Sequence, residues 1–347
     1  MQRSQTEWIV SRPPAPYRFA FTIVHDADSA YSARLEPLLD AFDALGLRVT
    51  LSAFAFWADW AHEGRIWSQW RTASPFNAPV AVPICDADEQ RFYQRAVARG
   101  HEVALHSPSD TSSPREQVIA AFELFDRVFG SYPAVYVEHS SSTNKDALSN
   151  EGANPESPYY CEDVLRQYGP WVWVDGIGAL RNESDGKFFE IPPSATFLNH
   201  HAAERYQLDK AFVRTGRWRM GGGDGFLATY TEENVDCLDR DGGIALVYTH
   251  LDDGWLDPRT RQLRADIRER LEYIASKNGW FAPASHILDR ARLADTIGVA
   301  RDGADIVLTN AAAVPLSDVV LRAPADNREM RAADLLPGTG QRLRSVS

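Results

Sequence analysis

Hydrophobic runs that end abruptly in polar residues alternate with amphipathic segments along the first half of the chain. Residues 17–24 (YRFAFTIV), 48–54 (RVTLSAF) and 101–106 (HEVALH) have the β-branched and aromatic content of buried strands. Between the first two runs, leucine and phenylalanine recur at three- and four-residue steps over residues 35–45, and Gly46 follows as a helix-ending residue. Strand, helix, strand is the order that builds a parallel sheet.

The same unit recurs farther along the chain. Residues 113–116 (SPRE) combine a capping serine, a proline for the first helical position and a capping-box glutamate, so we expect a helix to begin there. Strand-like runs follow at 134–139 (AVYVEH), 171–175 (WVWVD) and 243–250 (GIALVYTH). The pattern gives roughly six or seven strand–helix units, against the eight of a full barrel. We therefore predict an α/β fold, a distorted (β/α) barrel of about seven parallel strands.

From about Ile297 the helical period disappears. Short apolar runs, IVLT at 306–309 and VVLRA at 319–323, are separated by Asp-Gly, Asn-Ala and Ala-Pro pairs, which indicates short strands and turns. We therefore predict three parts, namely an N-terminal extension at residues 1–16, the barrel at 17–292 and a small C-terminal β-rich appendage at 293–347.

The composition is that of a globular protein and argues against several classes. The formal net charge is -12 with no basic stripe, so we expect no nucleic-acid partner. No apolar run reaches the roughly eighteen residues of a membrane helix, and the first residues lack a signal-like apolar core, so we expect no membrane span and a cytoplasmic location. The three cysteines, Cys85, Cys161 and Cys237, lie far apart without CxxC spacing. This arrangement fits a reducing compartment, and it indicates neither a disulfide framework nor a thiolate zinc site. The oligomeric state has no signal in the sequence.

Polar side chains close four of the predicted strands, and these four are Asp26, His106, His139 and His250. In parallel α/β folds the ligand site lies at the carboxyl ends of the strands, so we expect these side chains to converge. Imidazole and carboxylate groups together suit a divalent metal that keeps one position open for water and makes that water acidic. The alternative is that such a residue only ends a strand or bonds to a loop. That alternative is the better explanation for any single one of the four residues, but not for all four together.

The strand ends resemble the motifs of the polysaccharide deacetylase family, the NodB-homology domains of carbohydrate esterase family 4. The likeness covers residues 17–291 and extends to the branch found in O-antigen and capsule gene clusters. The family's first strand ends in Thr-Phe-Asp-Asp, and here the segment reads Thr22-Ile-Val-His25-Asp26, followed by Ala-Asp28. The resemblance implies that Asp26 binds metal. It places His25 where the family has its general base, with Asp28 as the other candidate for that role.

The second family motif is His-Ser/Thr followed three residues later by another His, and this chain reads His106-Ser-Pro-Ser-Asp110. The resemblance keeps His106 as a metal ligand and leaves the third ligand open between Asp110 and His139. We favour His139, which ends the next predicted strand and falls in a stretch similar to the Asn-His-Ser pattern of the O-antigen branch. Asp110 also fits as a turn residue before the helix start at Ser113.

The last family motif, Leu-x-His at the end of an apolar strand, matches residues 246–250 (LVYTH). The resemblance implies that His250 is the general acid that protonates the leaving amine. The family's Arg-x-Pro motif has no counterpart, because Glu138-His139-Ser140 stands in its place.

The resemblance implies a metal-dependent hydrolase that removes an N-acyl group, with acetyl expected, from an amino sugar of a bacterial surface polysaccharide or its precursor. It further implies a carbohydrate partner and one divalent ion, with zinc expected and cobalt, nickel or manganese as alternatives. Two other functions stay open. The same barrel could hydrolyse a small cyclic amide or imide, or, given His25 and the missing Arg-x-Pro, bind carbohydrate without turnover.

Three further features attract attention. The glycine cluster at 220–225 (MGGGDG) lacks the Gly-Lys-Ser/Thr of a phosphate loop, so we interpret it as a surface or substrate-lining loop. His200 and His201 are interpreted as loop residues rather than ligands. Four tryptophans are candidates for a sugar-stacking wall, with core packing as the alternative, and they are Trp57, Trp60, Trp67 and Trp70.

Overall fold

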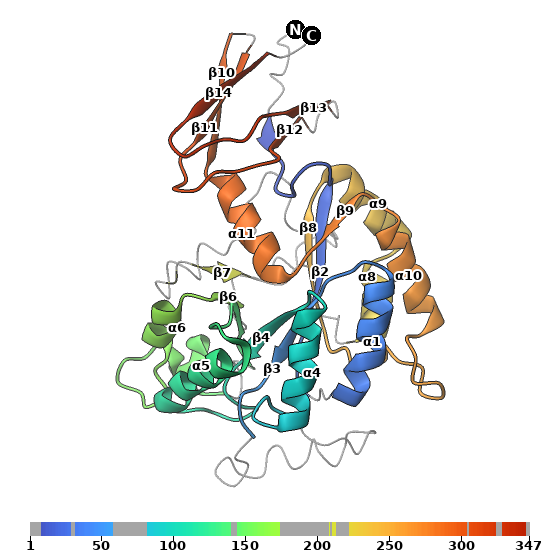
Figure 1. Cartoon of the computed structure of the whole chain (residues 1–347), viewed down its shortest axis with the longest axis vertical. Coiled ribbons are helices and arrows are strands. Elements are labelled where there is room, and N and C mark those ends of the chain that lie inside the picture. Colours follow the sequence, from blue (N-terminus) through green and yellow to red (C-terminus); the bar gives the residue numbers. More distant parts are fainter. Residues whose placement is uncertain are drawn as a thin grey trace.

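The computed structural model describes residues 8–28, 32–57, 82–139, 144–173, 208, 210–212, 222–303, 305–323 and 328–344. Several residues singled out in the sequence lie outside these ranges, namely Trp60, Trp67, Trp70, Ser140, Asp175, His200, His201, Met220 and Gly221. Figure 1 shows a larger α/β body, with two small antiparallel sheets at one end of the molecule.

A parallel sheet forms the centre of the α/β body. Its strands are β2 (Phe19–His25), β3 (Thr50–Ala53), β4 (Glu102–His106), β5 (Val135–Val137), β6 (Trp171–Trp173), β7 (Ala211–Phe212), β8 (Ile244–Thr249) and β9 (Gly279–Phe281). They are ordered β7-β6-β5-β4-β3-β2-β8, and β9 pairs with the amino half of β2. Every pair in this sheet is parallel. The predicted distorted barrel of about seven parallel strands is confirmed.

The two faces of the sheet bury different clusters because successive side chains of a strand point to opposite faces. Along β2, Phe19, Phe21 and Ile23 belong to a large cluster shared with the surrounding helices. Ala20 and Val24 belong to a second cluster that also contains strand residues of β5, β6 and β8 and one face of a single helix, α11 (Ala284–Asp295). We call these the outer and the inner face.

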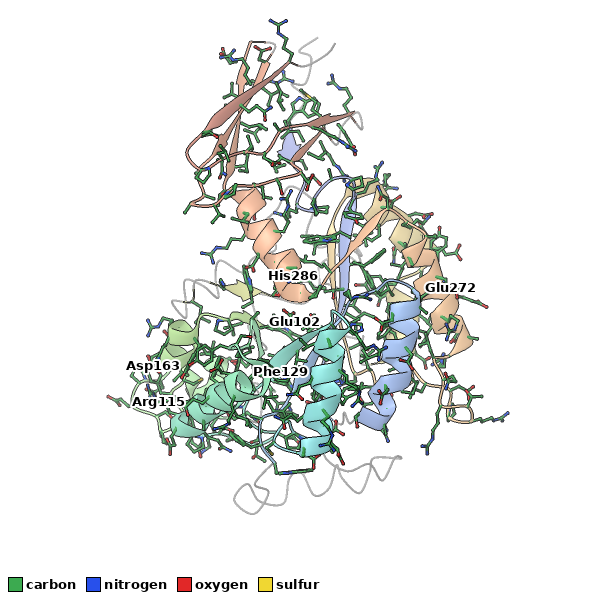
Figure 2. The ribbon with its side chains drawn as sticks, in the orientation of Figure 1. Glu102, Arg115, Phe129, Asp163, Glu272 and His286 are labelled. Atoms are coloured by element: carbon green, nitrogen blue, oxygen red, sulfur yellow. The ribbon has the colours of Figure 1, made fainter. Side chains whose placement is uncertain are left out.

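The outer face is covered by helices, of which the first has the periodicity predicted for residues 35–45. They are α1 (Ser32–Ala44), α4 (Ala87–Ala98), α5 (Arg115–Phe129), α6 (Glu162–Tyr168), α8 (Gly223–Thr229), α9 (Glu232–Asp241) and α10 (Ala265–Ala275), and a π-helix, η1 (Leu148–Gly152), precedes α6. A bidentate ion pair between Arg115 and Asp163 links α5 to α6. Figure 2 labels both of these side chains.

The expected capping box at the start of α5 is wrong. Pro114 occupies the N-cap position without a side-chain cap. The hydroxyl of Ser113 donates instead to the carbonyl of Thr111 at 3.2 Å, and its N–H donates to Asp146 Oδ1 at 3.0 Å. Tertiary contacts with Asp146 have therefore replaced the local cap. At the other end of α5, Gly130 has a φ of 77° and ends the helix as its C-cap.

Helix α11 is anchored at the amino ends of the strands, away from the predicted site. Glu102 Oε2 accepts a hydrogen bond from Thr50 Oγ1 at 2.7 Å and another from the N–H of Ser285 at 3.2 Å. Thr50 Oγ1 in turn accepts from the N–H of Ala284 at 2.9 Å. One half-buried carboxylate therefore joins β3, β4 and the first turn of α11, and Figure 2 shows Glu102 close to His286 of that turn.

Replacing Glu102 should destabilise the fold. Glu102→Ala leaves the Thr50 hydroxyl and the Ser285 N–H without their acceptor, so we expect the free energy of unfolding to fall by about 1–3 kcal/mol. The measurement is urea unfolding. Glu272, an exposed glutamate on α10 that Figure 2 also labels, gives a matched control, because Glu272→Ala should change that free energy by less than about 0.5 kcal/mol. Equal losses in the two variants would contradict the anchoring role of Glu102.

Two small antiparallel sheets make up the β-rich part. One contains β10 (Ile297–Asp302), β11 (Asp305–Asn310) and β14 (Gly340–Arg344), and the other contains β12 (Val320–Ala323), β13 (Arg328–Arg331) and β1 (Ile9–Val10). Strand β1 comes from the predicted N-terminal extension, and Ile9 pairs with Arg322. Trp8 also joins the apolar cluster of this part. We propose that residues 8–10 belong to the β-rich unit. None of the described helices combines the length and apolar character needed to cross a bilayer.

Candidate metal centre

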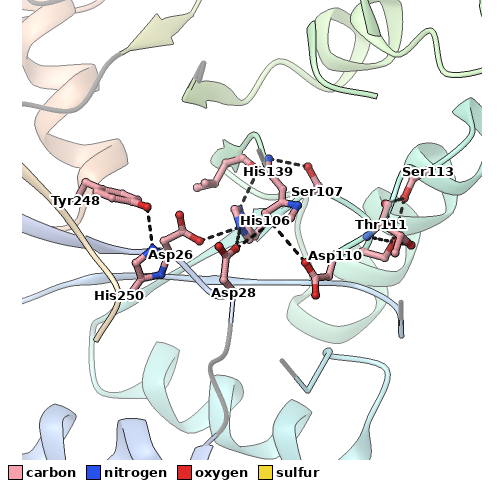
Figure 3. Close-up of polar contacts among 12 residues, drawn as sticks. Asp26, Asp28, His106, Ser107, Asp110, Thr111, Ser113, His139, Tyr248 and His250 are labelled. Atoms are coloured by element: carbon pink, nitrogen blue, oxygen red, sulfur yellow. Dashed lines mark hydrogen bonds and ion pairs between the residues drawn. The ribbon is translucent and has the colours of Figure 1, made fainter. Parts of the chain in front are cut away.

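Two carboxylates and two imidazoles meet at the carboxyl ends of β2, β4 and β5 (Figure 3). His106 Nε2 lies 3.1 Å from Asp26 Oδ1 and 3.3 Å from Asp28 Oδ1. His139 Nε2 lies 3.0 Å from the same oxygen of Asp28. Asp28 Oδ1 is therefore the atom that both imidazoles face. Asp26, His106 and His139 thus lie close together, as predicted for side chains at the strand ends.

The ring of His106 is held in one orientation. Its Nδ1 lies 3.2 Å from the carbonyl oxygen of Val137, which can only accept, so Nδ1 carries the proton in the neutral ring. The lone pair of Nε2 then points at the carboxylates. Phe54 packs against this ring, with centroids 4.6 Å apart. A histidine whose second nitrogen is bound to a carbonyl is the usual arrangement around a protein-bound metal.

His139 is positioned by its backbone. Its N–H donates to Ser107 Oγ at 3.1 Å, and that hydroxyl also lies 3.2 Å from the hydroxyl of Tyr136. Ser107 has a φ of 47°, in the left-handed region, and directly follows His106. The bend at Ser107 therefore couples the two histidines. The side chain of His139 is buried, and no described group bonds its Nδ1.

The electrostatics of the cluster favour charged forms of its members. Burial raises the pKa of Asp28, but His139 and His106 outweigh it and hold that pKa well below its usual range. Burial lowers the pKa of His139, but the charges of Asp28 and Asp110 outweigh the effect of burial and raise this pKa to about 10. The carboxylates thus attract positive charge at the two Nε2 atoms. A divalent cation can supply that charge in place of protons on the imidazoles.

The donor set fits a divalent metal. Asp28, His106 and His139 each offer one ligand atom within 4.8 Å of the others. One carboxylate with two imidazoles is a common catalytic zinc-type set, and it leaves a position open for water. Asp110 Oδ1 lies 3.5 Å from His139 Nε2 and is not part of this group. Burial raises the pKa of Asp110 to about 7 despite the neighbouring His139.

A second group consists of Asp26, Asp28 and His250, again within 4.8 Å. Asp26 is buried, and its contact with His106 lacks hydrogen-bond geometry, so no described group donates to its Oδ1. Burial and Asp28 raise the pKa of Asp26, while His250 and His106 outweigh them and lower it. Burial lowers the pKa of His250, but the charges of Asp26 and Asp28 outweigh the effect of burial and raise this pKa.

His25 has a different environment from the four cluster residues. Its Nδ1 lies 3.2 Å from the N–H of Leu251 and 3.4 Å from the carbonyl oxygen of Thr249, and no described group bonds its Nε2. The ring is fully buried, which lowers its pKa to about 3. The alternation along β2 explains this, because His25 follows the outer-face residues Phe21 and Ile23 by two-residue steps. Within the described part of the chain, the hydrogen bonds of the His25 side chain go to Thr249 and Leu251 and not to the carboxylates.

Two side chains near the site were missed in the sequence. Tyr248 places its hydroxyl 2.9 Å from His250 Nε2. Asp252 is buried beside His250, and its Oδ2 lies 3.6 Å from Nη1 of Arg34 on α1. Tyr248 and Asp252 each stand two positions from His250 in the sequence. This spacing is the local feature that could have indicated them as neighbours of the histidine.

The described part of the glycine cluster packs against the turn that follows His250. The N–H of Gly223 donates to the carbonyl oxygen of Asp253 at 2.8 Å. A Cβ at Gly223 would come within 2.2 Å of the carbonyl oxygen of Gly254, so a larger residue cannot fit without a backbone shift. Gly223 therefore permits close packing against the backbone of residues 253 and 254. The interpretation of the cluster as a surface or substrate-lining loop did not include this packing role.

No protein-family model and no curated protein matches the chain. Solved structures do match. The peptidoglycan deacetylase PdaC of Bacillus subtilis is 11% identical, with a TM-score of 0.34, over 82% of this chain and 96% of that one. A family 4 acetyl xylan esterase of Clostridium thermocellum, in complex with a cobalt ion, is 14% identical, with a TM-score of 0.35, over 78% and 90%. BA3943, a CE4 family pseudoenzyme of Bacillus anthracis, is 10% identical, with a TM-score of 0.33, over 80% and 67%.

Two of these three structures are of carbohydrate esterase family 4, the family that the sequence motifs resemble.

Proposed function

We propose that this protein is a metal-dependent hydrolase that removes an N-acyl group, with acetyl expected, from an amino sugar of a bacterial surface polysaccharide or its precursor. The observation that carries the proposal is the placement of a metal donor set directly beside a buried carboxylate and an imidazole. Asp28, His106 and His139 form the donor set, and Asp26 and His250 are the neighbours. Amide hydrolysis needs these three functions: an activated water, a base and an acid.

Asp28, His106 and His139 would hold the divalent ion, with zinc expected and cobalt, nickel or manganese as alternatives. When bound, the ion would polarise the acyl oxygen and make a water molecule acidic. This assignment exchanges two roles expected from the sequence, since Asp28 replaces Asp26 as the carboxylate ligand. The support is that the Nε2 atoms of His106 and His139 both face Asp28 Oδ1, whereas of these two imidazoles Asp26 pairs with that of His106.

Asp26 is the proposed general base. It is buried beside the donor set, and its Oδ1 accepts no hydrogen bond from a described group, so this oxygen is free to take a proton from the attacking water. His25 is less suited to the role because both of its described side-chain hydrogen bonds are to backbone at the end of β8, at Thr249 and Leu251. Its pKa of about 3 would also make it a weak base at neutral pH.

His250 is the proposed general acid. Its raised pKa keeps the imidazole protonated to higher pH than a solvent-exposed histidine. In the reaction, water adds to the acyl carbon and gives its proton to Asp26. The C–N bond then breaks, the carboxylic acid leaves, and the amine nitrogen takes a proton from His250.

A carbohydrate substrate is supported by the motif resemblance and by one exposed aromatic residue. Trp57 has 51% of its surface exposed and follows β3 by four residues. Phe54, three residues earlier, packs against the rings of His106 and His139. The backbone N–H groups of Ala55 and Phe56 donate to Pro108, which fixes this segment against the loop after His106. An exposed indole near an active site is a suitable surface for stacking a sugar ring.

The test measures two quantities on protein purified without a histidine tag. Elemental analysis should find about one equivalent of divalent metal, since one donor set of this kind binds one ion. An acetate-release assay over N-acetyl sugars, sugar nucleotides and oligosaccharides should show turnover that Asp26→Asn abolishes. Neither metal nor acetate, even after reconstitution, would rule the proposal out. Turnover only of cyclic amides or imides would indicate the second hydrolase function, and glycan binding without turnover would indicate a carbohydrate-binding protein.

A further inference from the structure

Strand β8 presents two polar side chains side by side on the inner face of the sheet. Leu246 belongs to the inner cluster and Tyr248 packs against that cluster, so the alternation along the strand also puts His250 on this side. Val247 belongs to the outer cluster instead. The Tyr248 ring meets Trp173 of β6 edge to face, with centroids 4.9 Å apart at 73°. The tyrosine is therefore held by the wall of the barrel, directly below the site.

The hydroxyl of Tyr248 reaches the imidazole of His250. Its oxygen lies 2.9 Å from His250 Nε2, and the two ring centroids are 5.4 Å apart at 73° (Figure 3). The partner of this ring nitrogen is thus a group on the same strand, two residues away. A histidine immediately after a strand would otherwise have freedom to rotate about its side-chain bonds.

We propose that Tyr248 is a positioning residue for His250, holding its imidazole by Nε2 in one orientation. A tyrosine hydroxyl suits this purpose because its oxygen accepts a hydrogen bond. It accepts from the Nε2–H of His250, so Nδ1–H supplies the proton that the protonated ring gives up, and the neutral ring still carries Nε2–H. The contact therefore survives the loss of the proton, so His250 keeps its place before and after it has acted as an acid. The catalytic consequence depends on the proposed function, whereas the hydrogen bond itself does not.

Tyr248→Phe removes the hydroxyl and keeps the ring contact with Trp173. We expect kcat for acetate release to fall about tenfold, as is common when the partner of a functional histidine is lost, with KM within about twofold and metal content unchanged. In a His250→Ala background the same change should lower kcat by less than about twofold, because a positioning residue acts only through the residue that it holds. Additive losses in the double variant would overturn the proposal.

Tyr230→Phe is the matched control. Tyr230 is a buried tyrosine that packs against Phe21 and Phe226 and does not belong to the site. Its substitution should leave kcat within about twofold of the parent. If both substitutions lower kcat equally, the effect of Tyr248→Phe is a general packing defect and the proposal fails.

A spectroscopic measurement separates this proposal from the proposed function. In protein labelled with ¹⁵N-histidine, the Nε2 resonance of His250, assigned through His250→Gln, should shift in Tyr248→Phe and stay unchanged in Tyr230→Phe. A shift without acetate release in the parent would uphold the hydrogen bond and refute the hydrolase. Turnover in the parent with an unshifted Nε2 resonance in Tyr248→Phe would uphold the hydrolase and refute the positioning role.

Discussion

Asp28→Asn should lose its metal, and Asp26→Asn should keep its metal and lose its turnover. Asp28 Oδ1 faces both His106 and His139, so its replacement by a neutral amide should weaken metal affinity by at least about tenfold. Asp26 lies beside the donor set as a base, so its loss should lower kcat by a factor of about 10²–10⁴. The measurement is elemental analysis after extensive dialysis, with acetate release on the same samples.

Asp163→Asn supplies the control for this comparison, since Asp163 pairs with Arg115 on the surface of α6 and should affect neither quantity. The two carboxylates would exchange roles if Asp26→Asn were metal-free and Asp28→Asn retained one equivalent. That result would restore the ligand assignment that the family resemblance implies.

The same analysis decides the third ligand. His139→Ala should be metal-free, because His139 belongs to the donor group, whereas Asp110→Ala should keep the ion. Metal loss in Asp110→Ala with retention in His139→Ala would reverse that choice.

His250→Ala should lower kcat by a factor of about 10²–10⁴ while leaving the metal in place. The loss should depend on pH. His250 acts in its protonated form, so turnover by the parent is present below the pKa of His250 and declines as the pH rises through it. Because neighbouring carboxylates raise that pKa above 6.5, the decline falls on the alkaline side of that value.

The pH dependence of kcat in the two proteins tests this role. The alkaline decline should be present in the parent and absent from the residual activity of His250→Ala. An unchanged alkaline decline in His250→Ala would show that another group is the acid. Loss of metal in His250→Ala would instead assign His250 to the donor set together with Asp26 and Asp28.

The sequence was sufficient for six strands of the barrel, β2 to β6 and β8, because their signals are local. A strand such as residues 19–25 is buried on both faces and therefore reads as a continuous apolar run. Helix α1 buries Leu35, Leu38, Leu39 and Phe42 at the predicted three- and four-residue steps, and α5 follows the segment where a helix start was expected. Parallel strands bring their carboxyl ends to one edge, so the gathering of His106 and His139 also followed from the order of the elements.

Long-range contacts decided what local patterns could not. Ser113 looks like a helix cap, but in the folded chain its N–H donates to Asp146 Oδ1 and its hydroxyl donates to the carbonyl of Thr111. Strand β1 pairs with β12, from the opposite end of the chain, and no local periodicity records a partner at that distance.

The roles proposed for the polar residues after β2 depend most on tertiary structure. The sequence by itself determined that His25, Asp26 and Asp28 stand together at a strand end, and that a histidine closes each of three later predicted strands. Only the folded sheet decided that the contacts of His25 lie with the backbone after β8, while Asp28 faces two imidazoles and Asp26 one. The physical reason is that the two-residue period of a strand fixes which side chains share a face, whereas the packing of helices and neighbouring strands determines what each face meets.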